Sequence, residues 1–234
     1  MKKSSPDTKK TDASGGPKTA KHKIMLVEDH PVMRQGLAQM IAQEPDLVVC
    51  GQFDDAGDAF EAIEKLAPDL AIVDLTLKTT SGLELVKNIK AAHPKLRVLV
   101  LSMYDETLYA ERSLRAGAAG YIMKQEAIEK VLAAVRQVLS GGIFLSEKMS
   151  SRLMHQLVGG KAPGPGSLME RLSDRELEVF GLIGEGRGTR QIAEQLHLSV
   201  KTIESHRAHI KEKLNLKTAT ELVHRAIQMR QDKQ

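Results

Sequence analysis

The sequence predicts a doubly wound α/β domain on a five-stranded parallel sheet, followed by a small all-α domain. First, short runs rich in Val, Ile and Leu alternate with segments of helical spacing as far as residue 139. Second, those runs are almost continuously apolar, which is typical of parallel strands that helices cover on both faces. Third, the Gly/Pro-rich segment 159–166 separates this region from a C-terminal part with helical spacing alone.

The composition fits a chain of two compact units, since 234 residues exceed one typical domain. No apolar run reaches the roughly 18 residues of a membrane span, and the start lacks a signal-peptide core, so we expect a cytoplasmic protein with no membrane partner. Lysines crowd the start among Ser, Gly and Pro, which predicts a disordered basic tail. The expected organisation is a tail over 1–22, an α/β domain over 23–146, a linker over 147–167 and an all-α domain over 168–234.

The elements of the first domain follow in order from the two periodicities. The expected strands are 24–28, 47–53, 70–74, 96–102 and 119–123. The expected helices are 31–43, 55–66, 81–92, 105–116 and 126–139. Parallel strands joined in this way need right-handed crossovers, which place helices on both faces of the sheet. The linker is expected to contain a short helix over 147–158, followed by a hinge.

Polar side chains stand where the apolar strands end. Glu28 and Asp29 end the first strand, Asp74 the third and Ser102 the fourth, and Lys124 follows the fifth. In a doubly wound sheet these ends converge on one crevice. Crowded carboxylates repel one another unless a cation lies among them, and Mg²⁺ suits a site made of oxygen ligands. The sequence therefore predicts an acidic, magnesium-binding crevice.

The motifs "VEDHP", "VDLTL", "LSMYDE" and "GYIMK" together resemble the receiver domain of two-component response regulators, over about residues 23–146. The resemblance implies that Asp74 accepts a phosphoryl group from a sensor histidine kinase. It also implies the other roles: metal ligands Glu28, Asp29, Asp74 and the backbone carbonyl of Thr76, phosphoryl contacts Lys124 and Ser102, and Tyr121 as the aromatic ring that turns inward with the signal. Lys78 and Thr79 stand where the family usually has Pro and Gly, so the loop beside the site is expected to differ in shape.

The second domain is expected to consist of four short helices. Ser173 and Glu176 have capping-box spacing at the start of the first helix, which Gly184 and Gly186 end. The second helix is expected over 189–197. The third is expected over 200–214 after an N-cap at Ser199, and the fourth follows a capping box of Thr218 and Glu221 and extends to about 229.

A helix, a tight turn and a second helix at the centre of this domain indicate a helix-turn-helix unit. The stretches "LSDRELEV", "GRGTRQIAEQL" and "SVKTIESHRAHIKEKL" resemble the LuxR-type DNA-binding module, and with a receiver they resemble NarL/FixJ-type response regulators. The resemblance implies a transcription regulator, not an enzyme, that binds double-stranded DNA as a homodimer when active. Gly188 replaces the Ser usually found before the second helix, so the cap is expected to pass to Thr189.

The third helix of this domain is expected to read DNA. Ile203, Ile210 and Leu214 recur at helical spacing and are expected to face the core. On the rest of the helix, Glu204 and Ser205 are expected to contact bases, with Ala208 on the same face. The candidate phosphate contacts are Lys201, Thr202, Arg207, His209 and Lys211.

Three other interpretations of the sequence stay open. The receiver-like domain could act without phosphorylation, as a dimerisation device on a DNA-binding regulator. A metal-dependent phosphohydrolase also uses an Asp at a strand end, although Thr76 stands where such an enzyme would have its second acid. The C-terminal helices could instead form a docking or oligomerisation bundle. In the two-domain interpretation, we expect the receiver to restrain the DNA-binding domain by docking over its third or fourth helix.

Overall fold

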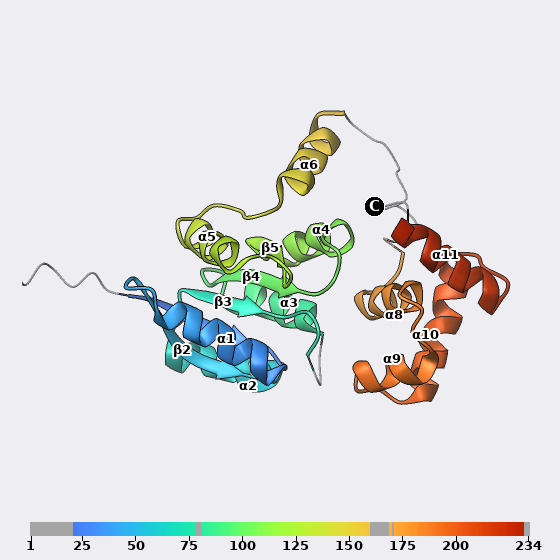
Figure 1. Ribbon diagram of the computed structural model, residues 1–234, viewed down its shortest axis with the longest axis horizontal. Coiled ribbons are helices and arrows are strands. Elements are labelled where there is room, and N and C mark those ends of the chain that lie inside the picture. Colours follow the sequence, from blue (N-terminus) through green and yellow to red (C-terminus); the bar gives the residue numbers. More distant parts are fainter. Residues whose placement is uncertain (1–20, 78–80, 160–168, 170, 232–234) are drawn as a thin grey trace, which may run out of the picture.

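The computed structural model describes residues 21–77, 81–159, 169 and 171–231 (Figure 1). The strands are β1 (His22–Val27), β2 (Leu47–Phe53), β3 (Leu70–Val73), β4 (Arg97–Ser102) and β5 (Gly120–Met123). The helices up to the linker are α1 (Pro31–Ala42), α2 (Ala56–Leu66), α3 (Gly82–Ala92), α4 (Glu106–Ala116), α5 (Ile128–Leu139) and α6 (Glu147–Gly159). The C-terminal helices are α8 (Asp174–Gly184), α9 (Thr189–Gln195), α10 (Val200–Lys213) and α11 (Ala219–Gln231).

The first domain is built on a five-stranded parallel sheet with the order β2-β1-β3-β4-β5. This order confirms the predicted doubly wound fold, of the flavodoxin-like kind. The chain leaves β1 for one edge and returns to β3 on the other side of β1, so the strand order reverses between these two neighbours. Their carboxyl ends therefore flank the crevice in which such sheets bind ligands.

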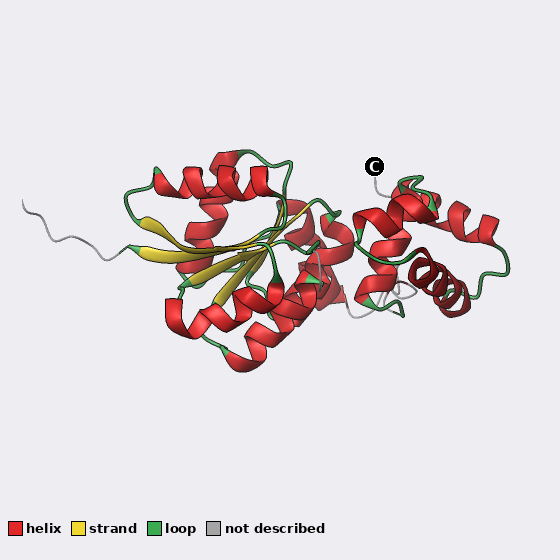
Figure 2. Ribbon diagram, turned by 90° about the horizontal axis from the view of Figure 1, so that it is seen from below, coloured by secondary structure: helices red, strands yellow, loops and turns green. Residues whose placement is uncertain are grey.

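Helices cover both faces of the sheet, as the apolar strands predict (Figure 2). On one face, α1 and α5 pack through residues such as Ile41 and Val135 against Leu26 and Ile72. On the other face, α2, α3 and α4 pack against the alternate side chains of the same strands, among them Val27 and Val73. Both layers exclude water from the strand interiors, so a polar group at a strand end meets solvent only at the crevice.

The second domain confirms most of the predicted helix starts. Ser173 and Glu176 form the capping box of α8, and the Ser199 side chain accepts a hydrogen bond from the Thr202 N–H at the start of α10. The predicted transfer of the α9 cap to Thr189 is wrong. Gly188 is the N-cap, and its N–H donates to Gln191 Oε1 at 2.8 Å. This is the half of a capping box that needs no side chain on the N-cap residue.

The two domains contact each other through α8, which lies against α3 and α4 of the first domain. Lys87 Nζ donates to Asp174 Oδ2 at 2.8 Å, and Ser81 Oγ donates to Glu178 Oε1 at 3.5 Å. The expectation of docking over the third or fourth C-terminal helix is therefore wrong for the hydrogen bonds among the described residues, which fall on the first helix and on Met169 and Leu172 just before it. Within that described part of the chain, no helix combines the length and apolar character that crossing a membrane requires.

Candidate functional site

The three acidic residues meet at the carboxyl ends of β1 and β3. Glu28 and Asp29 follow β1 directly, and Asp74 follows β3. Parallel pairing aligns Val27 with Val73, and the Asp74 N–H donates to Val27 O at 2.9 Å, so the two strand ends have the same height. Glu28 and Asp74 are each 2% exposed, and Asp29 is 8% exposed. The sheet register thus brings together the acidic crevice predicted from the sequence.

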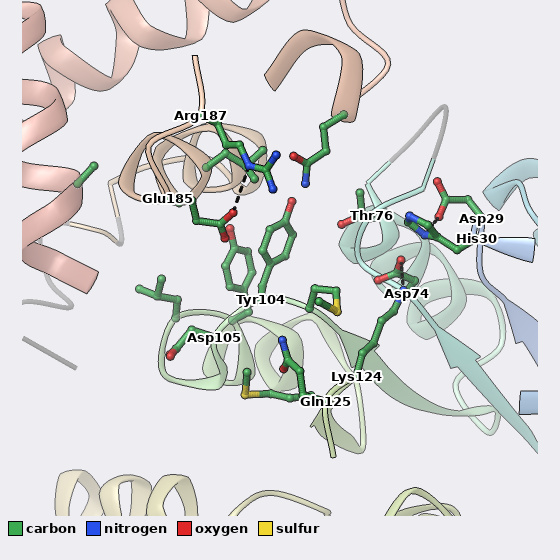
Figure 3. Close-up of a pocket in the computed structure, with 18 of the residues that line it drawn as sticks. Asp29, His30, Asp74, Thr76, Tyr104, Asp105, Lys124, Gln125, Glu185 and Arg187 are labelled. Atoms are coloured by element: carbon green, nitrogen blue, oxygen red, sulfur yellow. Dashed lines mark hydrogen bonds and ion pairs between the residues drawn. The ribbon is translucent and has the colours of Figure 1, made fainter. Parts of the chain in front are cut away.

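Lys124 joins two of these carboxylates. Its backbone N–H donates to Ser102 O at 2.9 Å, which places the residue just beyond β5 at the same edge of the sheet. Its Nζ lies 2.6 Å from Glu28 Oε2 and 2.8 Å from Asp74 Oδ2. The side chain is almost fully buried, and Figure 3 shows it reaching Asp74. Movement of this buried ammonium away from either carboxylate would leave uncompensated charge in a site without water, which is strongly unfavourable. The Lys124 side chain is therefore held in one geometry.

The charges in this site shift each other's proton affinities. Burial raises the pKa of Asp74 to about 7, against the opposing effect of Lys124 and with a further increase from Glu28. Burial acts to lower the pKa of Lys124, but the carboxylates of Asp74 and Glu28 outweigh it and raise that pKa above its ordinary value. Three acids around one ammonium leave an excess of acidic groups, which a divalent cation would offset.

The donor set fits such a cation. Glu28, Asp29, His30 and Asp74 each offer a ligand atom, and these atoms all lie within 4.8 Å of one another. Asp74 Oδ1 is buried and has no hydrogen-bond partner among the described residues, so an oxygen lone pair is available there. Thr76 lines the same cavity. His30 was not predicted as a site residue, although it stands in the "VEDHP" motif itself.

Ser102 and Tyr121 lie beside this cluster, on the Tyr104 side. Ser102 is fully buried and its Oγ accepts a hydrogen bond from the Tyr104 N–H at 3.2 Å. Tyr121 is also fully buried, and its hydroxyl donates to Tyr104 O at 2.7 Å. Tyr121 is therefore buried in this structure, and movement of its ring would break the bond to Tyr104. The departure predicted at Lys78 and Thr79 lies outside the described residues.

A cavity of about 700 Å³ connects this site to the second domain. Asp74 and Lys124 line one end, and Glu185 and Arg187, from the turn after α8, line the other (Figure 3). The Tyr104 ring stands between the two ends. The sequence analysis missed this part of the site, because residues more than a hundred positions apart share the cavity only when α8 lies on the first domain.

The predicted recognition helix, α10, has the expected inner face. Ile203 and Ile210 are fully buried, and Leu214 follows them into the core. The candidate DNA contacts differ in exposure: Lys201, Glu204, Ser205, Ala208 and His209 are exposed, whereas Thr202, Arg207 and Lys211 are half-buried. Thr202 Oγ1 is 2.7 Å from Ser199 Oγ, so this hydroxyl is shared with the helix cap. The exposed residues form the face that is available to a groove.

Comparison with known families matches both domains. Residues 24–136 match the model of the response regulator receiver domain, and residues 170–226 match that of the bacterial regulatory proteins of the luxR family.

Known relatives extend over both domains together. The oxygen regulatory protein NreC of Staphylococcus carnosus is 37% identical over 209 residues, which cover 88% of this chain and 96% of that protein. NreC of Staphylococcus haemolyticus is also 37% identical over the same shares of the two chains. RcsB of Salmonella enterica serovar Typhimurium, solved bound to promoter rprA in the presence of phosphomimetic BeF3⁻, is 27% identical with a TM-score of 0.58 over 87% of this chain and 97% of that one. The chain therefore belongs to the response regulators that join a receiver domain to a LuxR-type DNA-binding domain.

Proposed function

We propose that this chain accepts a phosphoryl group on Asp74 from a sensor histidine kinase and, once phosphorylated, regulates transcription by binding double-stranded DNA as a homodimer. The observation that carries the proposal is Lys124, which reaches both Glu28 and Asp74 at the carboxyl edge of the sheet. The family consists of transcriptional regulators, not enzymes, which sets aside the phosphohydrolase interpretation.

The chemistry at Asp74 is the transfer of a phosphoryl group from a phosphohistidine to a carboxylate. A carboxylate oxygen of Asp74 attacks the phosphorus of a phosphohistidine, the new P–O bond forms as the P–N bond breaks, and the imidazole nitrogen keeps the electron pair and takes a proton from water. A carboxylate is a weak nucleophile toward a dianion, so the site must position the groups and neutralise charge. Lys124 does both, since its ammonium fixes Asp74 Oδ2 at 2.8 Å and lies where phosphoryl oxygens would approach.

A divalent ion belongs to this proposal. Glu28, Asp29, Asp74 and the backbone carbonyl of Thr76 would hold Mg²⁺, consistent with the unpartnered Oδ1 of Asp74. When bound, the ion supplies positive charge that offsets the charge on the transferring phosphoryl group.

Ser102 and Tyr121 are the proposed transmitters of the phosphorylation signal. A phosphoryl group on Asp74 brings new charge and strong acceptor oxygens next to the Ser102 hydroxyl. That hydroxyl accepts from the Tyr104 N–H, and the Tyr121 hydroxyl donates to Tyr104 O. Tyr104, in the loop before α4, is therefore hydrogen-bonded to both proposed transmitters. Movement of Ser102 toward the phosphoryl group would release the Tyr104 N–H and shift the balance between two arrangements of this loop.

The same loop and helix restrain the DNA-binding domain in the unphosphorylated chain. Arg112 of α4 donates to the carbonyls of Met169 and Leu172 and to Asp174 Oδ1, so the residues just before α8 and the start of α8 are held on the receiver. A change in the α4 region would loosen these bonds. The interface is held by a few charge-assisted hydrogen bonds, each worth about 1.5–3 kcal/mol, so phosphorylation can open it.

DNA binding is assigned to α10, with α11 as the dimer contact. The exposed face of α10 carries Glu204 and Ser205 and would enter the major groove. Leu222 and Ala226 of α11 are buried in the domain core, and Ile227 remains 37% exposed on the same helix. Two copies joined through α11 would address a DNA element of two half-sites. RcsB has been solved as two dimers bound to two parallel DNAs, which supports this arrangement.

The proposed location is the cytoplasm, because the donor kinase domain and chromosomal DNA must both reach this chain there.

Phosphorylation of Asp74 is tested with the full chain, Mg²⁺ and a small acyl-phosphate donor. We expect one hydroxylamine-labile phosphate per chain, lost in Asp74→Asn and retained in Asp58→Asn, which alters an exposed aspartate of α2. Normal phosphate uptake by Asp74→Asn would contradict the assignment. Full DNA binding without phosphate uptake in the wild type would favour the phosphorylation-independent regulator instead.

A further inference from the structure

His30 lies against the acidic site from outside. It follows Asp29 directly and is the N-cap of α1, with Pro31 as the first residue of that helix. The proline restricts the preceding residue to an extended backbone, and His30 has φ −80° and ψ 112°. Its Nδ1 lies 2.7 Å from Asp29 Oδ1 (Figure 3). The same atom lies 3.1 Å from Glu28 Oε1. The backbone therefore fixes the residue next to two carboxylates, and only the side-chain torsions remain to be set.

The spacing of these atoms suits a shared metal ion. Neighbouring ligands at about 2.1 Å from an octahedral ion are roughly 3 Å apart, and the two distances from His30 Nδ1 to carboxylate oxygens bracket that value. The ligand atoms of Glu28, Asp29, His30 and Asp74 all lie within 4.8 Å of one another. The imidazole nitrogen and the two carboxylate oxygens are thus already spaced as neighbouring ligands of one ion would be.

A second, independent feature indicates a cation at this place. Asp74 is 2% exposed, and its Oδ1 has no hydrogen-bond partner among the described residues. A buried carboxylate oxygen without a partner is costly, and it belongs to the same cluster as the imidazole.

We propose that His30 is a nitrogen ligand of the divalent ion in this site, so that the site binds Mn²⁺ and later transition metals more tightly than its carboxylates alone would allow. The inference rests on the proposed metal site and adds a ligand to it. The His30 side chain is 66% exposed, so it covers the solvent side of the cluster, where Mg²⁺ keeps water molecules. The imidazole would replace one of these waters.

The metal preference follows from the ligand type. An oxygen-only site of carboxylates and carbonyls suits Mg²⁺, whereas imidazole suits transition metals, and affinity for such a mixed site rises from Mn²⁺ toward Cu²⁺. Mg²⁺ gains little from exchanging a water for a nitrogen ligand. Loss of His30 should therefore weaken Mn²⁺ binding strongly and Mg²⁺ binding weakly.

The test is pulsed electron paramagnetic resonance of Mn²⁺ added to the full-length protein, with metal affinities measured by calorimetry. The wild type is expected to show ¹⁴N coupling from one bound imidazole. In His30→Asn, which keeps a hydrogen-bond donor but loses the imidazole, the coupling should disappear, and the Kd for Mn²⁺ should rise about tenfold while that for Mg²⁺ changes less than twofold. The control is His155→Asn, an exposed histidine of α6, which should behave as the wild type does.

Two outcomes overturn the inference in different ways. Mn²⁺ that binds without ¹⁴N coupling, or with coupling that survives in His30→Asn, would leave the metal site intact and remove His30 from it. Failure of the wild type to bind either ion would refute the proposed metal site itself, and the role of His30 with it.

Discussion

Arg112 Nη1 of the receiver lies 3.0 Å from Asp174 Oδ1, at the first residue of α8 in the DNA-binding domain. Lys87 Nζ lies 2.8 Å from the other oxygen of the same carboxylate. Both Arg112 and Asp174 are largely shielded from water, so this pair is screened less than a surface ion pair. One aspartate therefore links α3 and α4 of the receiver to the start of the helix-turn-helix domain.

Removal of the guanidinium should release the DNA-binding domain. Arg112→Ala deletes the bonds to Asp174 and to the carbonyls of Met169 and Leu172. A loss of about 1.5–3 kcal/mol would shift the docking equilibrium roughly tenfold to a hundredfold toward separated domains. Small-angle X-ray scattering should show a larger radius of gyration, and the unphosphorylated variant should bind selected DNA more tightly than the wild type.

Arg136→Ala is the matched control, because Arg136 of α5 is an arginine whose ion-pair partners, Glu44 and Asp46, belong to the receiver itself. It should leave both measurements unchanged. An Arg112→Ala protein as compact as the wild type would mean that other contacts hold the domains together.

The contact should also depend on pH through Glu178 of α8. This carboxyl is 1% exposed, with Ser81 and Arg175 as its hydrogen-bonding neighbours, and burial raises its pKa to about 7, against the opposing effect of Arg175. In separated domains the group gains water and its pKa returns toward the ordinary value of 4.5. The docked state then holds the proton more tightly.

The sign of the effect follows from that difference. Docking is strongest below about pH 4.5 and weakens as the pH rises to about 7, where Glu178 has ionised in both states; the change is at most about 3 kcal/mol. Scattering between pH 5.5 and 8.5 should show domain separation increasing with pH. Glu178→Gln should flatten this dependence, and an unchanged slope in that variant would assign it to another group.

Much of the fold was predictable because it depends on local patterns. Every strand was predicted within two residues of its observed bounds, and the acids were placed at the strand ends where the structure has them. β1 begins at His22, earlier than its apolar run, because the His22 N–H donates to Asp46 O and extends the pairing with β2. Backbone partners, not hydrophobicity, set that boundary.

The domain contact was not predictable in the same way. Glu178 is a charged residue in a helix whose apolar stripe is already complete without it, and it lies buried against Ser81, 97 positions earlier in the chain. His30 was missed for a related reason: a histidine at a helix start has no chemical signature until the register of β1 and β3 brings Asp74 to the same place. Long-range neighbours decide both cases.

Gly82 should be irreplaceable beside Asp74. It begins α3, and its N–H donates to Leu75 O at 2.9 Å. A Cβ added there would lie 1.9 Å from Asp74 O, so Gly82→Ala must displace the backbone that carries Asp74. We expect a loss of about 1–3 kcal/mol in the free energy of unfolding, measured with urea, together with slower phosphorylation.

Gly36→Ala provides the contrast. Gly36 lies within α1, and an added Cβ meets no atom within 4 Å. Alanine lowers the entropy of the unfolded chain and suits a helix, so this variant should gain about 0.5–1 kcal/mol and keep its phosphorylation rate. Equal stability changes in the two variants would rule out the close approach at Asp74.

Different residues of α10 should determine base preference and general DNA affinity. Glu204 and Lys201 are both exposed on its outer face, opposite the buried Ile203 and Ile210. Glu204 can accept a hydrogen bond from a cytosine amino group, a contact worth about 1–3 kcal/mol against the wrong base. Glu204→Ala should therefore relax the preference at one base position in each half-site.

Lys201→Ala should weaken binding to all sequences alike and lower the slope of log K against log salt by about 0.9 per protomer, as expected for one lost phosphate contact. Binding titrations across single-base variants of a selected DNA site measure both effects. Glu212→Ala, an exposed acid near the end of the same helix, is the control and should keep the base preference. An unchanged preference in Glu204→Ala, or a base-specific loss in Lys201→Ala, would place the reading surface on other residues.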